Sequence, residues 1–152
     1  MPPALSEMTT SVRPPELKRK LREAGFEVYR TLSDRVILAE RIRDNLIMDS
    51  GVAARIDDGF AVSVIVRAQL SHFPGAAPTD VEDRAGHLAV NFLENGYLKD
   101  SSSQSEVLDP SNPEKSLDTC YEVHLDKKVE GLEALFSQLR AALQEQRSTA
   151  AD

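Results

Sequence analysis

One run of alternating side chains, residues 60–70, gives the clearest structural pattern in this chain. Six of its positions fall on one face of an extended strand: Phe60, Val62, Val64, Val66, Ala68 and Leu70. The other face is mixed: Ala61, Ser63, Ile65, Arg67 and Gln69. A helix cannot sort the residues in this way, because helical side chains recur about every 3.6 residues and strand side chains every two. The pattern therefore predicts a half-buried strand that pairs with residues 52–56 through a turn at Asp58-Gly59.

The remaining N-terminal half predicts one helix followed by strands. Proline opens the helix over residues 14–24, and glycine follows its end. Alternation then predicts strands over residues 26–32 and 35–42. Residues 43–51 mix apolar with turn-forming side chains, which predicts a loop or an irregular sheet edge. A single helix over about residues 34–48 is the alternative.

The C-terminal half predicts two longer helices. Thr79 and Glu82 form a capping box at the start of the first, which ends at Asn95-Gly96. Asp126 is the predicted cap of the second. Its apolar stripe is wider than a coiled-coil seam, which indicates a helix packed on a sheet or on a partner. That stripe comprises Val129, Leu132, Leu135, Phe136, Leu139, Ala142 and Leu143.

The segment between these helices predicts short strands and polar loops. Residues 99–105 and 109–116 are polar and are interpreted as loops that flank a short strand near 106–108. Residues 120–125 alternate again. The resulting fold class is α+β, with an antiparallel sheet of about four to five strands, helices packed on one face, and the order α-β-β-β-β-α-β-β-α.

Length and composition favour one soluble domain. We expect residues 14–147 to form it, residues 1–13 to be a disordered N-terminal segment, and residues 148–152 to be a frayed tail. The 152 residues carry a net charge of -7, which disfavours nucleic acid as a partner. No apolar run approaches the ~20 residues of a transmembrane helix, and the start of the chain lacks a signal sequence. These features predict a cytoplasmic protein that does not bind membranes.

Candidate chemistry is sparse. Asp83 and His87 are one helical turn apart and could hold a metal, but a zinc site needs three or four ligands. Cys120, Glu122 and His124 share a strand face, yet neighbours two apart lie roughly 6–7 Å from each other, too far for direct activation of a thiol. Neither type of glycine-rich nucleotide-binding loop occurs. We therefore expect no enzymatic activity, no cofactor and no metal.

Two surfaces are candidates for binding a partner protein. Ile65 lies on the mixed face of its strand between polar residues, with Arg67 and Gln69 as a possible polar rim. Alternatively, the last helix could provide an apolar seam, formed by Leu135, Leu139 and Leu143. A monomer would struggle to cover this much apolar surface, so a homodimer is expected.

The order of elements over about residues 15–146, the small size and the acidity resemble the class I type III secretion chaperones and the sensory-transduction regulators of the YbjN type. The resemblance implies a non-catalytic, chaperone-like homodimer that binds extended segments of another protein. Two alternatives stay open. One is a small α+β pocket protein that binds an apolar ligand, and the other is a regulatory adaptor or immunity-type inhibitor.

Overall fold

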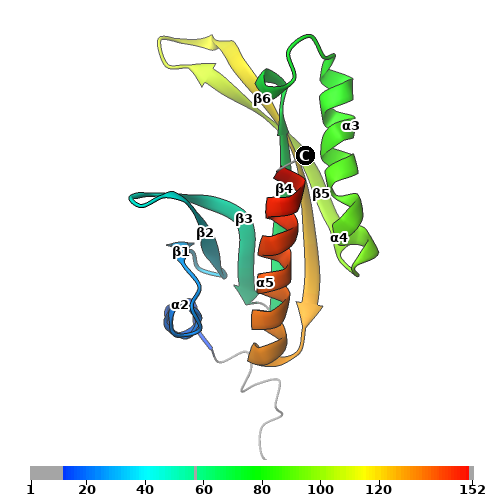
Figure 1. Ribbon diagram of the computed structural model, residues 1–152. Helices are drawn as coiled ribbons and strands as arrows, with labels where there is room; N and C mark the ends of the chain where they lie inside the picture. The colour runs from blue at the N-terminus through cyan, green and yellow to red at the C-terminus, as the bar shows by residue number, and fades with distance from the viewer. Residues whose placement is uncertain (1–11, 57, 151–152) are drawn as a thin grey trace, which may run out of the picture. The chain divides into compact units, whose positions relative to one another are not determined.

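A computed structural model describes residues 12–56 and 58–150, the last two of these without their side chains. The described residues form an α+β fold with a six-stranded antiparallel sheet in the order β1-β2-β3-β4-β6-β5 (Figure 1). The elements in chain order are α2 (Pro14–Glu23), β1 (Val28–Thr31), β2 (Arg35–Arg43), β3 (Leu46–Ile56), β4 (Phe60–Gln69), η1 (Leu70–His72), α3 (Pro78–Leu88), α4 (Val90–Glu94), β5 (Leu98–Asp109), β6 (Asn112–Val129) and α5 (Gly131–Ala150). The expected fold class is confirmed, with one or two strands more than predicted.

The chain divides into two compact units. Unit 1 comprises residues 1–64 and 126–152, and unit 2 comprises residues 65–125. Strands β4 and β6 both continue from one unit into the other. The predicted domain, residues 14–147, spans both units, and most of the predicted disordered segment, residues 1–11, lies outside the described residues.

The core of unit 1 forms where α2, the strands and α5 bury their apolar stripes. Leu17 and Leu21, one helical turn apart on α2, are fully buried. The rings of Phe26 and Phe136 pack 5.8 Å apart. The guanidinium of Arg140 lies 5.0 Å from the Phe26 ring and donates a 3.2 Å hydrogen bond to the carbonyl of Ala24, which ties α5 to the end of α2.

The hairpin of β3 and β4 has the predicted register, with Val52 opposite Val64. Val64 and Val66 are buried, as their face of the strand predicted. The mixed face differs from the prediction near the start of β4. Ala61 and Ser63 are buried as well. Within unit 1, β4 is therefore buried on both faces.

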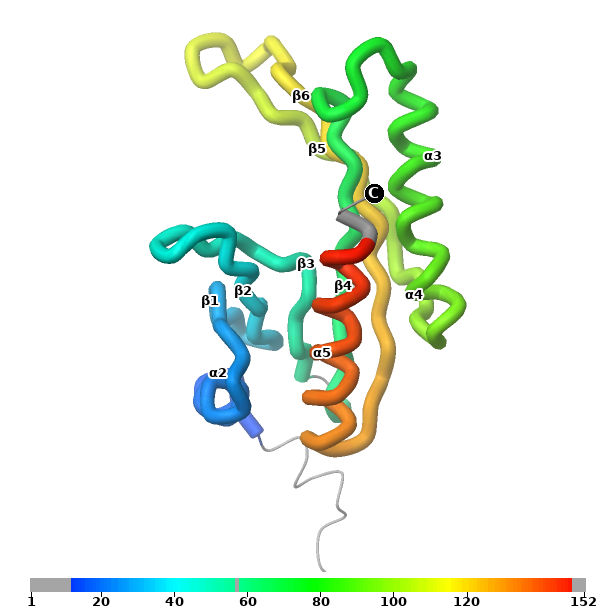
Figure 2. Tube along the Cα trace, viewed as in Figure 1, coloured from blue at the N-terminus to red at the C-terminus, as the bar shows by residue number. Residues whose placement is uncertain are grey.

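Residues 43–51 form neither a loop nor the alternative helix, and their structure is closest to the irregular sheet edge that was also predicted. Most of them belong to β3, which forms a hairpin with β2 through a turn at Asp44-Asn45 (Figure 2). Gly51 has φ +79°, a conformation that other residues rarely adopt, and its amide donates a 2.7 Å hydrogen bond to the carboxylate of Asp49. The Ser50 hydroxyl donates a 2.8 Å bond to the carbonyl of Leu38. The polar residues that suggested a loop thus shape an irregular pair of strands.

The core of unit 2 joins α3 and α4 to strand β6. The apolar stripe that the periodicity places on these helices is buried at Val81, Ala85, Ala89 and Phe92, whereas Leu93 is 43% exposed. Phe92 packs edge-on against Tyr97, with ring centroids 5.3 Å apart. Burial raises the pKa of the Tyr97 hydroxyl to about 12. On β6 the alternation predicted for 120–125 is confirmed, since Tyr121, Val123 and Leu125 are all buried.

Two predicted helix starts are wrong. The capping box is absent because Pro78 occupies the first turn of α3 and the N-cap is Ala77, which leaves Thr79 inside the helix. Asp126 does not cap α5. It stays in β6, where its carboxylate accepts hydrogen bonds from Arg55 and Ser63. Helix α5 extends to Ala150, and the last two residues of the predicted tail, 151–152, lie outside the described residues.

The predicted polar loops around residue 107 are two long strands. Residues 99–105 lie within β5 and 112–116 within β6, and the two strands form a hairpin (Figure 2). The carboxylate of Asp109 accepts hydrogen bonds from the amide and the hydroxyl of Ser111, which closes the turn. Almost every residue of β5 is exposed, so burial in a core does not favour apolar side chains in this strand.

Candidate functional site

Strand β5 is the most unusual surface of unit 2. It is 12 residues long, and all of its residues except Asp109 are exposed. It is also the last strand in the order of the sheet, so among the described residues only β6 pairs with it. An edge strand presents a row of amide and carbonyl groups that can pair with another chain.

Natural proteins usually protect such an edge, and β5 is protected by charged side chains such as Lys99 and Asp100 but not by proline or by a short length. Proline removes backbone donors from many edge strands, but Leu98–Asp109 contains none. The opposite edge of the sheet differs, because β1 is only four residues long and its pairing is interrupted by a bulge between Val28 and Arg30. Of the two edges, β5 is therefore the one suited to receive a further strand.

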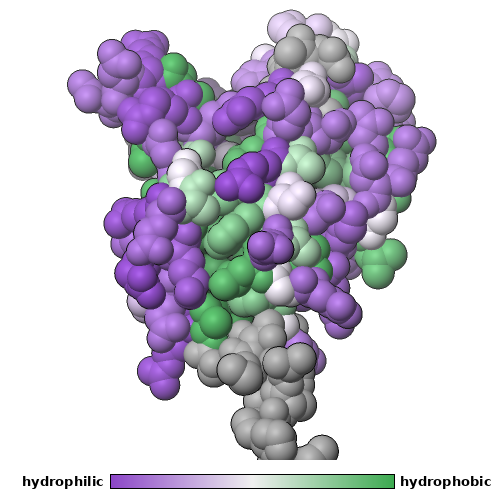
Figure 3. Space-filling model, turned by 60° about the horizontal axis from the view of Figure 1, so that its bottom comes forward, coloured by the Kyte–Doolittle hydropathy of each residue, from purple (hydrophilic) through white to green (hydrophobic). Residues whose placement is uncertain are grey.

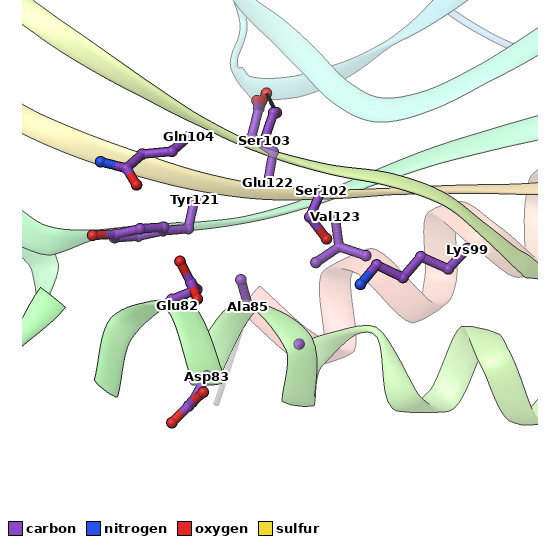
Figure 4. Close-up of a pocket in the computed structure, with 11 residues that line it drawn as sticks. Glu82, Asp83, Ala85, Lys99, Ser102, Ser103, Gln104, Tyr121, Glu122 and Val123 are labelled. Atoms are coloured by element: carbon purple, nitrogen blue, oxygen red, sulfur yellow. Dashed lines mark hydrogen bonds between the residues drawn. The ribbon is translucent and has the colours of Figure 1, made fainter. Parts of the chain in front are cut away.

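A cleft of about 400 Å³ lies beside this strand, within unit 2. Helix α3 contributes Glu82, Asp83, Ala85 and Gly86, β5 contributes Lys99 and residues 102–104, and β6 contributes residues 121–123. Figure 4 shows the Glu82 carboxylate and the Tyr121 ring together at one end of the cleft. Lys99 lies at the other end, and Asp83 points away. The cleft thus has an acidic, aromatic end and a basic end.

The opposite face of β6 carries a hydrogen-bonded polar cluster. Arg67 donates a 2.5 Å hydrogen bond to Glu122, and the Ser103 hydroxyl lies 3.3 Å from both Glu122 and the Nε2 atom of His124. Burial alone would raise the pKa of Glu122, but the hydrogen bond and charge of Arg67, together with His124 and Ser103, lower it. Glu122 is therefore an ionised, bound carboxylate.

Ser103, His124 and Glu122 do not have the geometry of a hydrolytic triad. In a triad the hydroxyl and the carboxylate bind different nitrogens of the histidine ring. Here Nε2 is the ring nitrogen that lies 3.3 Å from Ser103 and also 3.6 Å from Glu122. Cys120, which the sequence placed on the same face, has a raised pKa, mainly because of burial and then because of the charge of Glu122. That shift disfavours the reactive thiolate.

The metal site that the sequence suggested on α3 does not form. Asp83 and His87 are both exposed on α3 and form no ion pair with each other. Within residues 12–56 and 58–150, no group of three or more His, Cys, Asp and Glu side chains could hold a metal ion. In the same ranges, no helix is long and apolar enough to cross a membrane.

The residues predicted to bind a partner differ in their burial and in their hydrogen bonds. Ile65 is half-buried, Arg67 is bound to Glu122, and Gln69 donates a 3.2 Å hydrogen bond to Asp118. Leu135 and Leu139 are fully buried inside unit 1. They hold α5 in its own fold and are not accessible as a seam, while Leu143 is half-buried beside Phe26 and Arg140. The sequence did not reveal the β5 edge, because its polar composition resembles that of a loop.

Most of the net negative charge of the protein belongs to unit 2, the unit that carries β5. Residues 65–125 contain ten Asp and Glu against four Lys and Arg, a net charge of -6 with neutral histidine. The remaining residues contain fifteen acidic and fourteen basic side chains, a net charge of -1. A net negative charge of this size attracts cations, and the attraction weakens with salt.

Comparison with known proteins adds no relative: no family model, no curated protein and no solved structure matches this chain.

Proposed function

We propose that this protein is a non-catalytic, chaperone-like binding module that takes up an extended segment of a partner protein as an additional strand along β5. The exposed edge of β5 carries this proposal. Strand addition obtains its affinity from main-chain hydrogen bonds, so it needs a long edge and no particular side chains. The polar sequence of β5 suits this role, since it keeps a free edge soluble.

A partner segment is a better occupant than nucleic acid or an apolar small molecule. The net charge of -6 on unit 2 repels phosphates. Most of the residues that line the cleft beside β5 carry a charge or a hydroxyl group, whereas pockets for apolar ligands are lined mostly by hydrophobic side chains. We place the module in the cytoplasm, where a single free cysteine stays reduced.

The test begins with a phage-displayed library of random linear 12-residue peptides, selected on the intact protein. Enriched peptides are then measured by fluorescence anisotropy against two matched variants, Ser101→Pro and Ser102→Pro. Successive amides of an edge strand point alternately toward the neighbouring strand and away from it. One proline therefore removes an outward donor, and the other removes a donor to β6.

We expect the variant that keeps the melting temperature to bind the peptides at least tenfold more weakly, because an outward proline blocks docking and spares the β5–β6 pairing. The second variant should melt at a lower temperature, since it loses a ladder hydrogen bond. If the well-folded variant binds every enriched peptide as tightly as the original protein does, strand addition at β5 is refuted.

We also propose that the module is a homodimer, as the resemblance to secretion chaperones implies. Val90 and Leu93 are exposed one helical turn apart on α4, and Leu98, which is 76% exposed, follows closely in the chain. Apolar surface is also visible among hydrophilic residues in Figure 3. Such side chains favour an interface with a second copy.

Light scattering should give twice the chain mass of 16.8 kDa at micromolar concentration. Leu93→Glu should halve that mass and leave the circular dichroism spectrum unchanged, because it places a charge in the interface and not in the core. Leu117→Glu, at an exposed position on β6, is the matched control and should leave the mass doubled. A mass near 17 kDa for the original protein would exclude a stable dimer.

A further inference from the structure

The cleft beside β5 holds charges that have no partner of their own. Within the part of the chain that the structure describes, the side chains of Glu82 and Lys99 make no hydrogen bond or ion pair with another residue. Glu82 is exposed, and its carboxylate is directed toward the ring of Tyr121 (Figure 4). A carboxylate beside an aromatic ring is a favourable environment for a cation.

The wall of the cleft is also open at a position where a side chain would fit. Gly86 lies inside α3, where glycine costs about 1 kcal/mol relative to alanine. Its backbone does not require glycine, because its φ is not positive. A Cβ atom added there would meet no atom within 4 Å. No neighbouring residue packs into the space that a side chain at Gly86 would occupy, so the effect of the glycine is to widen the cleft.

We propose that this cleft binds one lysine or arginine side chain of the segment that adds to β5, an inference that rests on the proposed function. Side chains of an added strand would alternate between the two faces of the sheet. Those on the helix side would share the face of Tyr121 and Val123, which line the cleft together with Ser102 of β5. A side chain on that face thus reaches the cleft while its backbone pairs with the edge.

Charge selects the residue that occupies the cleft. The Glu82 end attracts a cationic group, and the net charge of -6 on unit 2 disfavours an acidic one. Lys99 at the other end repels a second cation within the same cleft. The expected preference is therefore for one basic residue at a fixed position of the bound segment, and not for a basic run.

The same peptide library tests this specificity, with selections on the original protein, on Glu82→Gln and on Glu82→Lys. Peptides enriched on the original protein should share one lysine or arginine position. Glu82→Gln should weaken their binding about tenfold, and selection on Glu82→Lys should yield aspartate or glutamate at that position. Gly86→Leu should also weaken binding without lowering the melting temperature, because it fills the cleft and improves the helix. Glu94→Gln is the matched control and should bind normally, since it makes the same chemical change at an exposed position of α4 that does not line the cleft.

The outcomes separate this inference from the proposed function. Peptides that lose binding in the well-folded proline variant, yet show no basic position and no response to Glu82→Gln, would overturn the inference and leave strand addition at β5 intact. No enrichment at all, or enriched peptides that tolerate the proline, would overturn both.

Discussion

Val64→Asp should unfold unit 1 or reduce its free energy of unfolding by at least ~3 kcal/mol. Val64 is fully buried in β4 opposite Val52 of β3. A carboxylate at this position would lose its hydration, and its apolar neighbours would offer no hydrogen-bond donor in return. Since small proteins are stable by only about 5–15 kcal/mol, such a loss should be visible in any denaturation curve.

Urea denaturation followed by circular dichroism measures this effect, with Val107→Asp as the control. The control makes the same chemical change in a strand, but Val107 is 46% exposed on β5. Its free energy of unfolding should stay within about 0.5 kcal/mol of the original value. Equal losses in the two variants would show that Val64 does not lie in the interior.

Ser63→Asp should be nearly as damaging, although the pattern along the strand places Ser63 on the mixed face. Ser63 is buried, and its hydroxyl donates a 2.5 Å hydrogen bond to the carboxylate of Asp126, which also accepts a 3.1 Å bond from Arg55. The substitution replaces a donor by a second carboxylate at hydrogen-bond distance. We expect a loss of several kcal/mol at pH 7.

The damage should depend on pH. Repulsion by Asp126 raises the pKa of the introduced carboxyl in the folded state above its value of about 4 in the unfolded chain. A group with a raised pKa stabilises the fold fully below its unfolded pKa, and this contribution disappears as the pH rises through the folded value. Ser63→Asp should therefore approach the stability of the original protein near pH 4 and lose it above.

Ser63→Asn is the control for this prediction, because an amide has the same shape as the carboxyl group and can still donate to Asp126. It should stay close to the original stability at every pH. Denaturation curves for Ser63→Asp that keep the same deficit from pH 4 to pH 8 would contradict the proposed repulsion.

Both of these effects begin in the strand that the sequence predicts best. Alternation places Val64 in the interior correctly, because a buried sheet face selects apolar residues at every second position. Alternation cannot show that Ser63 is buried too. That depends on Asp126, 63 residues away along the chain, which forms part of the same sheet.

Strand β5 is a second feature that local periodicity cannot predict. Helix α3 with its buried stripe and the β3–β4 hairpin follow from local periodicity, since each buries one face against a core. Residues 98–109 are almost all exposed, so burial does not favour apolar side chains at these positions. Their sequence therefore resembles that of a loop. Only pairing with β6 makes them a strand.

By itself, the sequence determined the α+β class, the apolar faces of β4, α3 and α5, and the net negative charge. These features are local, because each depends on residues close together in the chain. The tertiary structure alone decided which strand lies at the edge of the sheet, that Leu135 and Leu139 face the interior of unit 1, and that Glu82 and Tyr121 share a cleft. Each of these depends on pairing between distant segments, for which local periodicity contains no signal.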